Sequence, residues 1–280
     1  MRRSLLLWLG LFALLTACPS EPVDPSDDDD AVDDDDTGET CGRASGGSGG
    51  ALDSMVWLSV DGFGDPSDNS SEYEVLIYAP SSAQVTPMPV LMLVGRRMPL
   101  PYAQNEQIFS DLLGITDWAE EYGWLVMLPN PGNTGGDQIN WTDSAVDAAF
   151  FDAALDTVAG RWDVDLDRIH AVGSSAGGRA ASYLGWAHAD RLASIVNHAG
   201  GNPFGTWPET PWDAECAGLF IHDEDDPVVP RAAVEDVVAM WEDAGQVTET
   251  YFDYPNEHEW VPESLFPTMK TFFDGVCNER

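Results

Sequence analysis

Short apolar runs alternate with helix-like segments from residue 55 to the C-terminus, and this alternation constrains the fold of the 280-residue chain more than any other feature. Two runs, at residues 55–60 and 73–78, come first and are joined by a segment rich in Gly, Asp and Ser. Strands that alternate with helices predict a mostly parallel sheet flanked by helices, with ligands at the carboxyl ends of the strands. Further strands are expected at residues 90–94, 125–128, 169–172, 195–196, 219–221 and 250–254, and helices at residues 108–122, 144–162, 176–186, 232–244 and 264–273.

Residues 1–17 have the features of a lipoprotein signal peptide. Two arginines precede an eleven-residue apolar run, residues 5–15, which suits a signal peptide and is too short to span a membrane. The run ends in Leu15-Thr16-Ala17-Cys18, which resembles a bacterial lipobox and implies cleavage before Cys18 and lipidation of its thiol. The alternative is an ordinary secretory signal in which Cys18 is incidental. Both interpretations predict export, either as a cell-envelope lipoprotein (outer membrane or periplasm) or as an extracellular protein.

Acidic residues dominate the charge, with 49 Asp and Glu against 12 Lys and Arg and a formal net charge of −37. Eleven of the acidic residues lie in residues 18–40, which hold no basic residue, and this charge run predicts an Asp-rich disordered tether. Residues 41–280, the expected folded domain, still hold 38 acidic and 10 basic residues. Phosphate binding needs clustered Lys and Arg, so nucleic acid is excluded as a partner, and the lipid anchor at Cys18 is the expected membrane contact.

The segment Gly173-Ser174-Ser175-Ala176-Gly177 matches the pattern G-x-S-x-G directly after an expected strand and before an expected helix. Such a sharp turn needs glycine on both sides because the backbone is crowded, and it lifts the central serine out of the sheet. The helix start adds free N–H groups and the positive end of the helix dipole. We therefore interpret Ser175 as a nucleophile with the Ala176 N–H as an oxyanion donor. The alternative is a glycine-rich helix start.

A serine nucleophile on this kind of turn needs a carboxylate and a histidine, which follow it in that chain order. Residues 222–230, after the expected strand at 219–221, contain four adjacent carboxylates at 223–226. His258 follows the strand at 250–254 and is the base on order and placement. The other histidines fit less well: His170 begins a strand at the wrong end, His188 lies in or after a helix, His198 could line the pocket but precedes every candidate acid, and His222 is interpreted as a packed strand-end residue.

Several motifs together resemble one family. The run at residues 167–178, which contains the serine turn, is similar to the nucleophile segment of secreted polyhydroxybutyrate depolymerases and feruloyl esterases. Residues 146–150, 222–230 and 258–260 resemble further segments of that family. The resemblance covers residues 41–280 and implies an α/β-hydrolase catalytic domain with a mostly parallel central sheet, a carboxylic ester as substrate and no cofactor.

The resemblance also implies roles for single residues. The family's acid motif places the catalytic acid at Asp226, and its histidine motif places the base at His258. Pro227 supports the same acid, because a residue before proline is held in an extended backbone, whereas Asp225 is the neighbouring contender. The chain departs from the family after the third strand, where Val94-Gly95-Arg96-Arg97 replaces a His-Gly pair. Backbone donors do not depend on the side chain, so we expect the Arg96 N–H to serve beside that of Ala176.

Three tryptophans lie in polar segments rich in Pro and Gly, where a scaffold gains little from them. Trp141, Trp207 and Trp212 are interpreted as an apolar or aromatic substrate-binding wall, with loop packing as the alternative. The sequence favours neither interpretation.

The cysteines also leave alternatives open. Cys216 begins an expected strand, and Cys277 follows a helix that should return to the same end of the sheet, so a Cys216–Cys277 disulfide is plausible in an exported protein. A Cys41–Cys277 disulfide is the competing expectation. No CxxC pair or His/Cys ladder predicts a metal site.

These observations favour an exported, lipid-anchored serine esterase without cofactor or metal, acting through Ser175, Asp226 and His258. The expected substrate is a small-molecule or polymeric ester of the feruloyl, acetyl-polysaccharide or polyhydroxyalkanoate type. Two alternatives are kept: a non-catalytic surface binding protein on the same fold, and a serine peptidase of the prolyl-oligopeptidase type.

Overall fold

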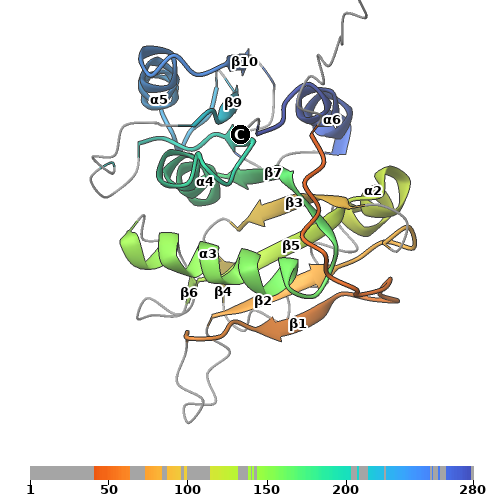
Figure 1. The fold of residues 1–280 in the computed structure, drawn as a ribbon. Coiled ribbons are helices and arrows are strands. Elements are labelled where there is room, and N and C mark those ends of the chain that lie inside the picture. Colours follow the sequence, from red (N-terminus) through yellow and green to blue (C-terminus); the bar gives the residue numbers. More distant parts are fainter. Residues whose placement is uncertain are drawn as a thin grey trace, which may run out of the picture. The chain divides into compact units, whose positions relative to one another are not determined.

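Eight strands form one sheet in the computed structural model, in the spatial order β1-β2-β5-β3-β7-β8-β9-β10 (Figure 1). β2 pairs antiparallel with both β1 and β5, and the neighbours from β5 to β10 pair parallel. A short antiparallel pair, β4 (Met98–Pro99) and β6 (Gln138–Ile139), forms a second sheet. The strands of the large sheet are Val56–Ser59 (β1), Glu74–Tyr78 (β2), Met88–Val94 (β3), Leu125–Asn130 (β5), Val164–Ser174 (β7), Ser194–His198 (β8), Ala217–His222 (β9) and Thr248–Phe252 (β10).

The structure describes residues 41–63, 73–83, 87–95, 98–99, 114–131, 138–139, 141, 144–202, 207, 214–223, 225–252, 254, 258 and 263–278. These residues belong to one compact unit, Glu39–Arg280. The predicted signal peptide and tether at residues 1–40 lie outside the described residues. Within the described ranges, none of the helices has the length and apolar character needed to cross a membrane.

Helices cover the sheet because its strands are apolar on both faces. In β3, Val90, Met92 and Val94 belong to one core cluster and Leu91 and Leu93 to the other, as the period of two in a strand requires. The first cluster includes residues of α3 (Ala145–Ala159), α4 (Ala176–Ala187) and α5 (Arg231–Asp243). The second includes residues of α2 (Ile115–Tyr122) and α6 (Phe266–Asp274), which follows the 3-10 turn Glu263–Leu265. The predicted helix-flanked, mostly parallel sheet is thereby confirmed.

The predicted helix at 108–122 is seen only in its second half. α2 begins after Gly114, and residues 101–113 lie outside the described part of the chain. The helix ends at Gly123, directly after the predicted range. Its φ of 72° is left-handed, and its N–H donates to the carbonyl of Ala119.

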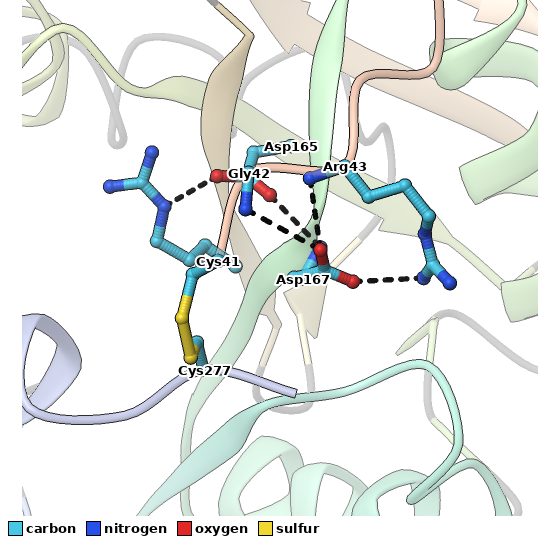
Figure 2. Close-up of a disulfide and its surroundings, with 7 residues drawn as sticks. Cys41, Gly42, Arg43, Asp165, Asp167 and Cys277 are labelled. Atoms are coloured by element: carbon cyan, nitrogen blue, oxygen red, sulfur yellow. Dashed lines mark hydrogen bonds and ion pairs between the residues drawn. A yellow bond between two sulfur atoms is a disulfide. The ribbon is translucent and has the colours of Figure 1, made fainter. Parts of the chain in front are cut away.

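The first described residues lie along the amino-terminal half of β7 (Figure 2). The N–H of Leu166 donates to the carbonyl of Arg43, and the Arg43 guanidinium lies 3.0 Å from Asp167 Oδ1. The N–H of Asn278 donates to the carbonyl of Asp167, so one residue of β7 holds both ends of the domain. A disulfide between Cys41 and Cys277 closes this arrangement.

The Cys216–Cys277 pairing was therefore wrong, and its competitor is the one observed. Cys216 lies in the core cluster beneath α4 and α5, where Trp241 Nε1–H donates to its carbonyl. Cys277 instead lies beside the segment that begins at Cys41, with Cα atoms 6.1 Å apart. Burial raises the pKa of the Cys216 thiol, which keeps it uncharged and unreactive.

Removal of the disulfide should lower stability. The two cysteines are 236 residues apart, and a cross-link over so long a loop restricts the unfolded chain and contributes about 4 kcal/mol. In a domain of this size that corresponds to a fall in Tm of roughly 10 °C. Thermal melts of a Cys41→Ser/Cys277→Ser variant, measured by circular dichroism, check this. Reductant should lower the Tm of the wild type in the same way. Cys216→Ala is the control, because it keeps the disulfide and its Tm should still fall when reductant is added. Equal Tm values for the wild type with and without reductant would contradict the prediction.

Candidate active site

Ser175 lies on a sharp turn between β7 and α4, at the carboxyl end of the parallel strands. Its φ of 55° and ψ of −119° fall in a region that non-glycine residues rarely adopt, and such strain costs about 1–3 kcal/mol. Gly173 and Gly177 permit the turn, because a Cβ on the first would overlap the backbone of the second, and a Cβ on Gly177 would overlap the carbonyl of Val94. This is the strand–turn–helix geometry that the G-x-S-x-G pattern predicts.

The structure brings Ser175, His258 and Asp226 together from three separate connections of the sheet. His258, which follows β10, has Nε2 2.9 Å from Ser175 Oγ and Nδ1 2.8 Å from Asp226 Oδ2. A carboxylate can only accept, so the Nδ1–H of His258 donates to Asp226. Nε2 is then left as an acceptor for the hydroxyl proton of Ser175. The arrangement can remove a proton from the serine and stabilise the imidazolium that results.

Asp226 is held by its own loop. Its Oδ1 accepts the N–H groups of Val228 and Val229, at 2.7 and 2.8 Å, which directs Oδ2 toward His258. Burial of the side chain tends to raise the pKa of Asp226, but the bonds from Val229, His258 and Val228 outweigh burial and lower it. The carboxylate is therefore ionised at neutral pH. Asp225 is exposed, and its N–H donates to Asp223 Oδ1, so it is not the residue that faces His258.

Two further histidines lie close to these residues. His222, at the end of β9, is buried with Nδ1 3.9 Å from Asp226 Oδ2. His198, at the end of β8, is also buried, with Nδ1 3.0 Å from Ser174 Oγ. Burial lowers the pKa of both rings, and that of His198 falls to about 4. Both are neutral at neutral pH and do not repel an imidazolium that forms at His258.

The remaining histidines lie apart from this cluster. His170 lies within β7 between the rings of Trp124 and Phe273, and burial lowers its pKa to about 3. His188 follows α4, and its Nδ1 lies 3.5 Å from Asp152 Oδ1. Among the described residues, the partners of these two histidines do not include Ser175, Asp226 or His258.

The predicted oxyanion donors come from the start of α4 and from the segment after β3. Ala176 is the first residue of α4, and the first N–H groups of a helix have no acceptor within it. The end of β3 lies beside this turn, as the closeness of Gly177 to Val94 shows. Arg96 lies outside the described residues, so its contribution to an oxyanion hole stays a prediction.

No protein-family model and no curated protein matches the sequence. Solved structures with similar folds include a Bacillus cereus carboxylesterase, with 15% identity, a TM-score of 0.51 and coverage of 79% of this chain and 93% of that one. A ferulic acid esterase matches with 13% identity, a TM-score of 0.58 and coverage of 81% and 98%. An acetyl xylan esterase from Aspergillus awamori matches with 12% identity, a TM-score of 0.57 and coverage of 79% and 99%. The chain has the α/β-hydrolase fold.

In the α/β-hydrolase fold the nucleophile lies on the strand-to-helix elbow, and the acid and the histidine follow it in the chain. Ser175, Asp226 and His258 have both that order and the contacts to match it. Among the residues that the structure describes, no group of three or more His, Cys, Asp or Glu side chains is arranged to hold a metal ion.

The structure describes the predicted aromatic wall only in part. Trp141 is buried in the core near Phe150, and Arg179 Nη2 donates to its carbonyl. Trp207 is half-buried against the rings of Trp186 and Trp241. These contacts favour the packing alternative for both residues. Trp212 lies outside the described residues.

The contact between Ser174 and His198 was not predicted from the sequence. It depends on the parallel register in which these two residues are direct neighbours on β7 and β8. The available signal was that each lies two residues after the end of its apolar run, 169–172 for Ser174 and 195–196 for His198. Adjacent parallel strands place such residues at one edge of the sheet.

Proposed function

We propose that the protein is a serine esterase that hydrolyses carboxylic esters through a covalent acyl-enzyme. The observation that carries the proposal is the unbroken set of contacts from Ser175 Oγ through the imidazole of His258 to Asp226. An exposed serine without a base is a poor nucleophile, and a histidine oriented by a carboxylate activates it. The strained turn at Ser175 supports the proposal, because strain of this kind concentrates at functional sites.

Each contact has a chemical role in this reaction. His258 Nε2 takes the proton as Ser175 Oγ attacks the ester carbonyl, and Asp226 stabilises the imidazolium. Backbone N–H groups, with that of Ala176 as the described candidate, hold the tetrahedral oxyanion. The imidazolium gives its proton to the departing alcohol, which leaves an acyl-serine. Water then attacks the acyl carbon with His258 again as base, which releases the acid and restores Ser175.

The substrate class is proposed as feruloyl or acetyl esters of polysaccharides, or polyhydroxyalkanoate esters. The motif resemblance at residues 167–178 and 222–230 supports this range, and esterases among the similar folds are consistent with it. A net charge of −37 disfavours polyanionic substrates, which leaves neutral esters as the favoured group.

A fluorophosphonate probe tests the proposal directly, because it labels only an activated serine. We expect labelling at Ser175 and hydrolysis of at least one ester in a panel of short acyl, feruloyl and hydroxybutyrate-oligomer esters. A folded protein that is neither labelled nor active would support the non-catalytic binding protein instead. Labelling with cleavage of peptides and of no ester would support the peptidase alternative.

We also propose that the protein is exported and anchored through a lipid on Cys18. The basic start, the apolar run at residues 5–15 and the Leu-Thr-Ala-Cys sequence support this. The Cys41–Cys277 disulfide is consistent with it, because disulfides persist in oxidising compartments outside the cytoplasm.

Replacement of Cys18 by serine should release the protein from membranes. The variant lacks the thiol that would carry the lipid, and the tether at residues 18–40 has eleven acidic and no basic residues to hold an anionic surface. Fractionation of cells that express the wild type and Cys18→Ser checks this. A Cys18→Ser protein that is exported and still sediments with membranes would show that the anchor lies elsewhere.

A further inference from the structure

The end of β8 lies directly against the nucleophile turn. The carbonyl of His198 accepts the N–H of Ser175 at 2.8 Å. The ring of the same residue lies 3.0 Å, Nδ1 to Oγ, from the side chain of Ser174. One residue of a neighbouring strand therefore holds two consecutive residues of the turn, one through its backbone and one through its side chain.

The two contacts of His198 lie at a point where the backbone is strained. Ser175 has a positive φ, and so does Ala199, the residue after His198. Such conformations persist only when surrounding contacts determine them. The N–H of Ala199 donates to the carbonyl of Ile221, which fixes the end of β8 to β9 in turn. The nucleophile is thus connected through His198 to the strand that leads into the loop of Asp226.

The chemistry of the His198 ring suits this position. Burial is the largest cause that lowers the pKa of His198 to about 4. Charge on His258 and His222 would lower this pKa further, and the carboxylates of Asp226 and Asp223 act in the opposite direction. A neutral ring can pair with the Ser174 hydroxyl in either tautomer, because that hydroxyl both donates and accepts. A charged ring here would oppose the imidazolium at His258.

We propose that His198 is a positioning residue that holds the Ser174–Ser175 turn in the geometry needed for attack. The inference rests on the proposed esterase function and adds a residue that the catalytic triad does not include. His198 acts through Ser174 and the backbone of Ser175 and does not itself touch the ester. A nucleophile displaced by about 1 Å can lose about 100-fold in rate, which sets the scale of the effect.

The test compares His198→Leu, His198→Asn and Ser174→Ala with p-nitrophenyl acetate as substrate, with rates expressed per active site titrated by the fluorophosphonate probe. His198→Leu should lower kcat about 10- to 100-fold with little change in KM. His198→Asn should retain most of the rate, because an asparagine side chain places a polar atom near the position of Nδ1. Ser174→Ala removes the same bond from the other side with a smaller change, and should lower kcat about five- to ten-fold.

A double variant separates positioning from general destabilisation. Because the two side chains share one contact, Ser174→Ala added to His198→Leu should cost less than the product of the single effects. Equal rates per active site in His198→Leu, Ser174→Ala and the wild type would overturn the inference while the esterase proposal stands. So would equal losses in His198→Asn and His198→Leu. A wild-type protein with neither labelling nor hydrolysis would instead refute the esterase proposal.

Discussion

Under the proposed mechanism, replacement of Ser175 by alanine should lower the turnover of ester substrates by about 10⁶-fold, as removal of the nucleophile does in serine proteases. The loss is large because, in the proposed mechanism, the hydroxyl at 2.9 Å from His258 Nε2 forms the covalent bond to the substrate. Steady-state rates with an activated ester, together with loss of fluorophosphonate labelling, measure the effect. Any remaining rate should come from substrate binding and oxyanion stabilisation alone.

Ser174→Ala is the matched control for this prediction. The two serines are adjacent in the chain, but Ser174 Oγ is buried and bonded to His198, whereas Ser175 Oγ lies beside His258. The control should therefore lose only about five- to ten-fold in activity, the loss expected when the contact between Ser174 and His198 is removed. Comparable losses in Ser174→Ala and Ser175→Ala, with both variants folded, would contradict the assignment of the nucleophile.

Replacement of Asp226 by asparagine should lower turnover by about 10⁴-fold, the size of the effect in the well-studied serine-protease example. An asparagine amide at this position can donate to His258 Nδ1, which favours the tautomer that carries its proton on Nε2. A protonated Nε2 cannot accept the hydroxyl proton of Ser175. The loss of the negative charge also removes stabilisation of the imidazolium. The measurement is ester hydrolysis by the purified variant, with circular dichroism to show that it is folded.

The lowered pKa of Asp226 gives the same prediction a pH dependence. The Asp226 carboxylate stays ionised in the folded protein down to a pH below the ordinary range of an aspartate. Its negative charge, which stabilises the imidazolium, is therefore present at neutral pH and is lost only as the pH falls through the lowered pKa. The activity of the wild type near neutral pH should therefore not be limited by titration of Asp226.

Asp225→Asn is the matched control for Asp226→Asn. Asp225 is exposed and contributes its backbone N–H to Asp223, so its side chain is not needed by His258. We expect most of the activity to remain. A folded Asp225→Asn variant that is more damaged than Asp226→Asn would move the catalytic acid one residue back along the loop.

The sequence alone predicts the fold and the edge of the sheet where chemistry is possible. Apolar runs of strand length and helical spacing reflect interactions among near neighbours in the chain, and they mark β3, β5 and the strands from β7 to β10. Since those strands are parallel, residues that directly follow them meet at one edge. That rule was sufficient to select Ser175, the loop of Asp226 and the segment of His258 as neighbours.

Tertiary structure decided the contacts that depend on register and on packing between distant segments. The Cys41–Cys277 disulfide follows from the way both ends of the folded domain attach to Asp167, which no local pattern encodes. The pairing of Ser174 with His198 follows from the register of β7 on β8, and a shift of one residue would separate them. Local periodicity specifies which residues form a strand and which face they occupy. Packing of the whole core sets which distant side chains meet, as for Ser174 and His198, 24 residues apart, and for Cys41 and Cys277, 236 residues apart.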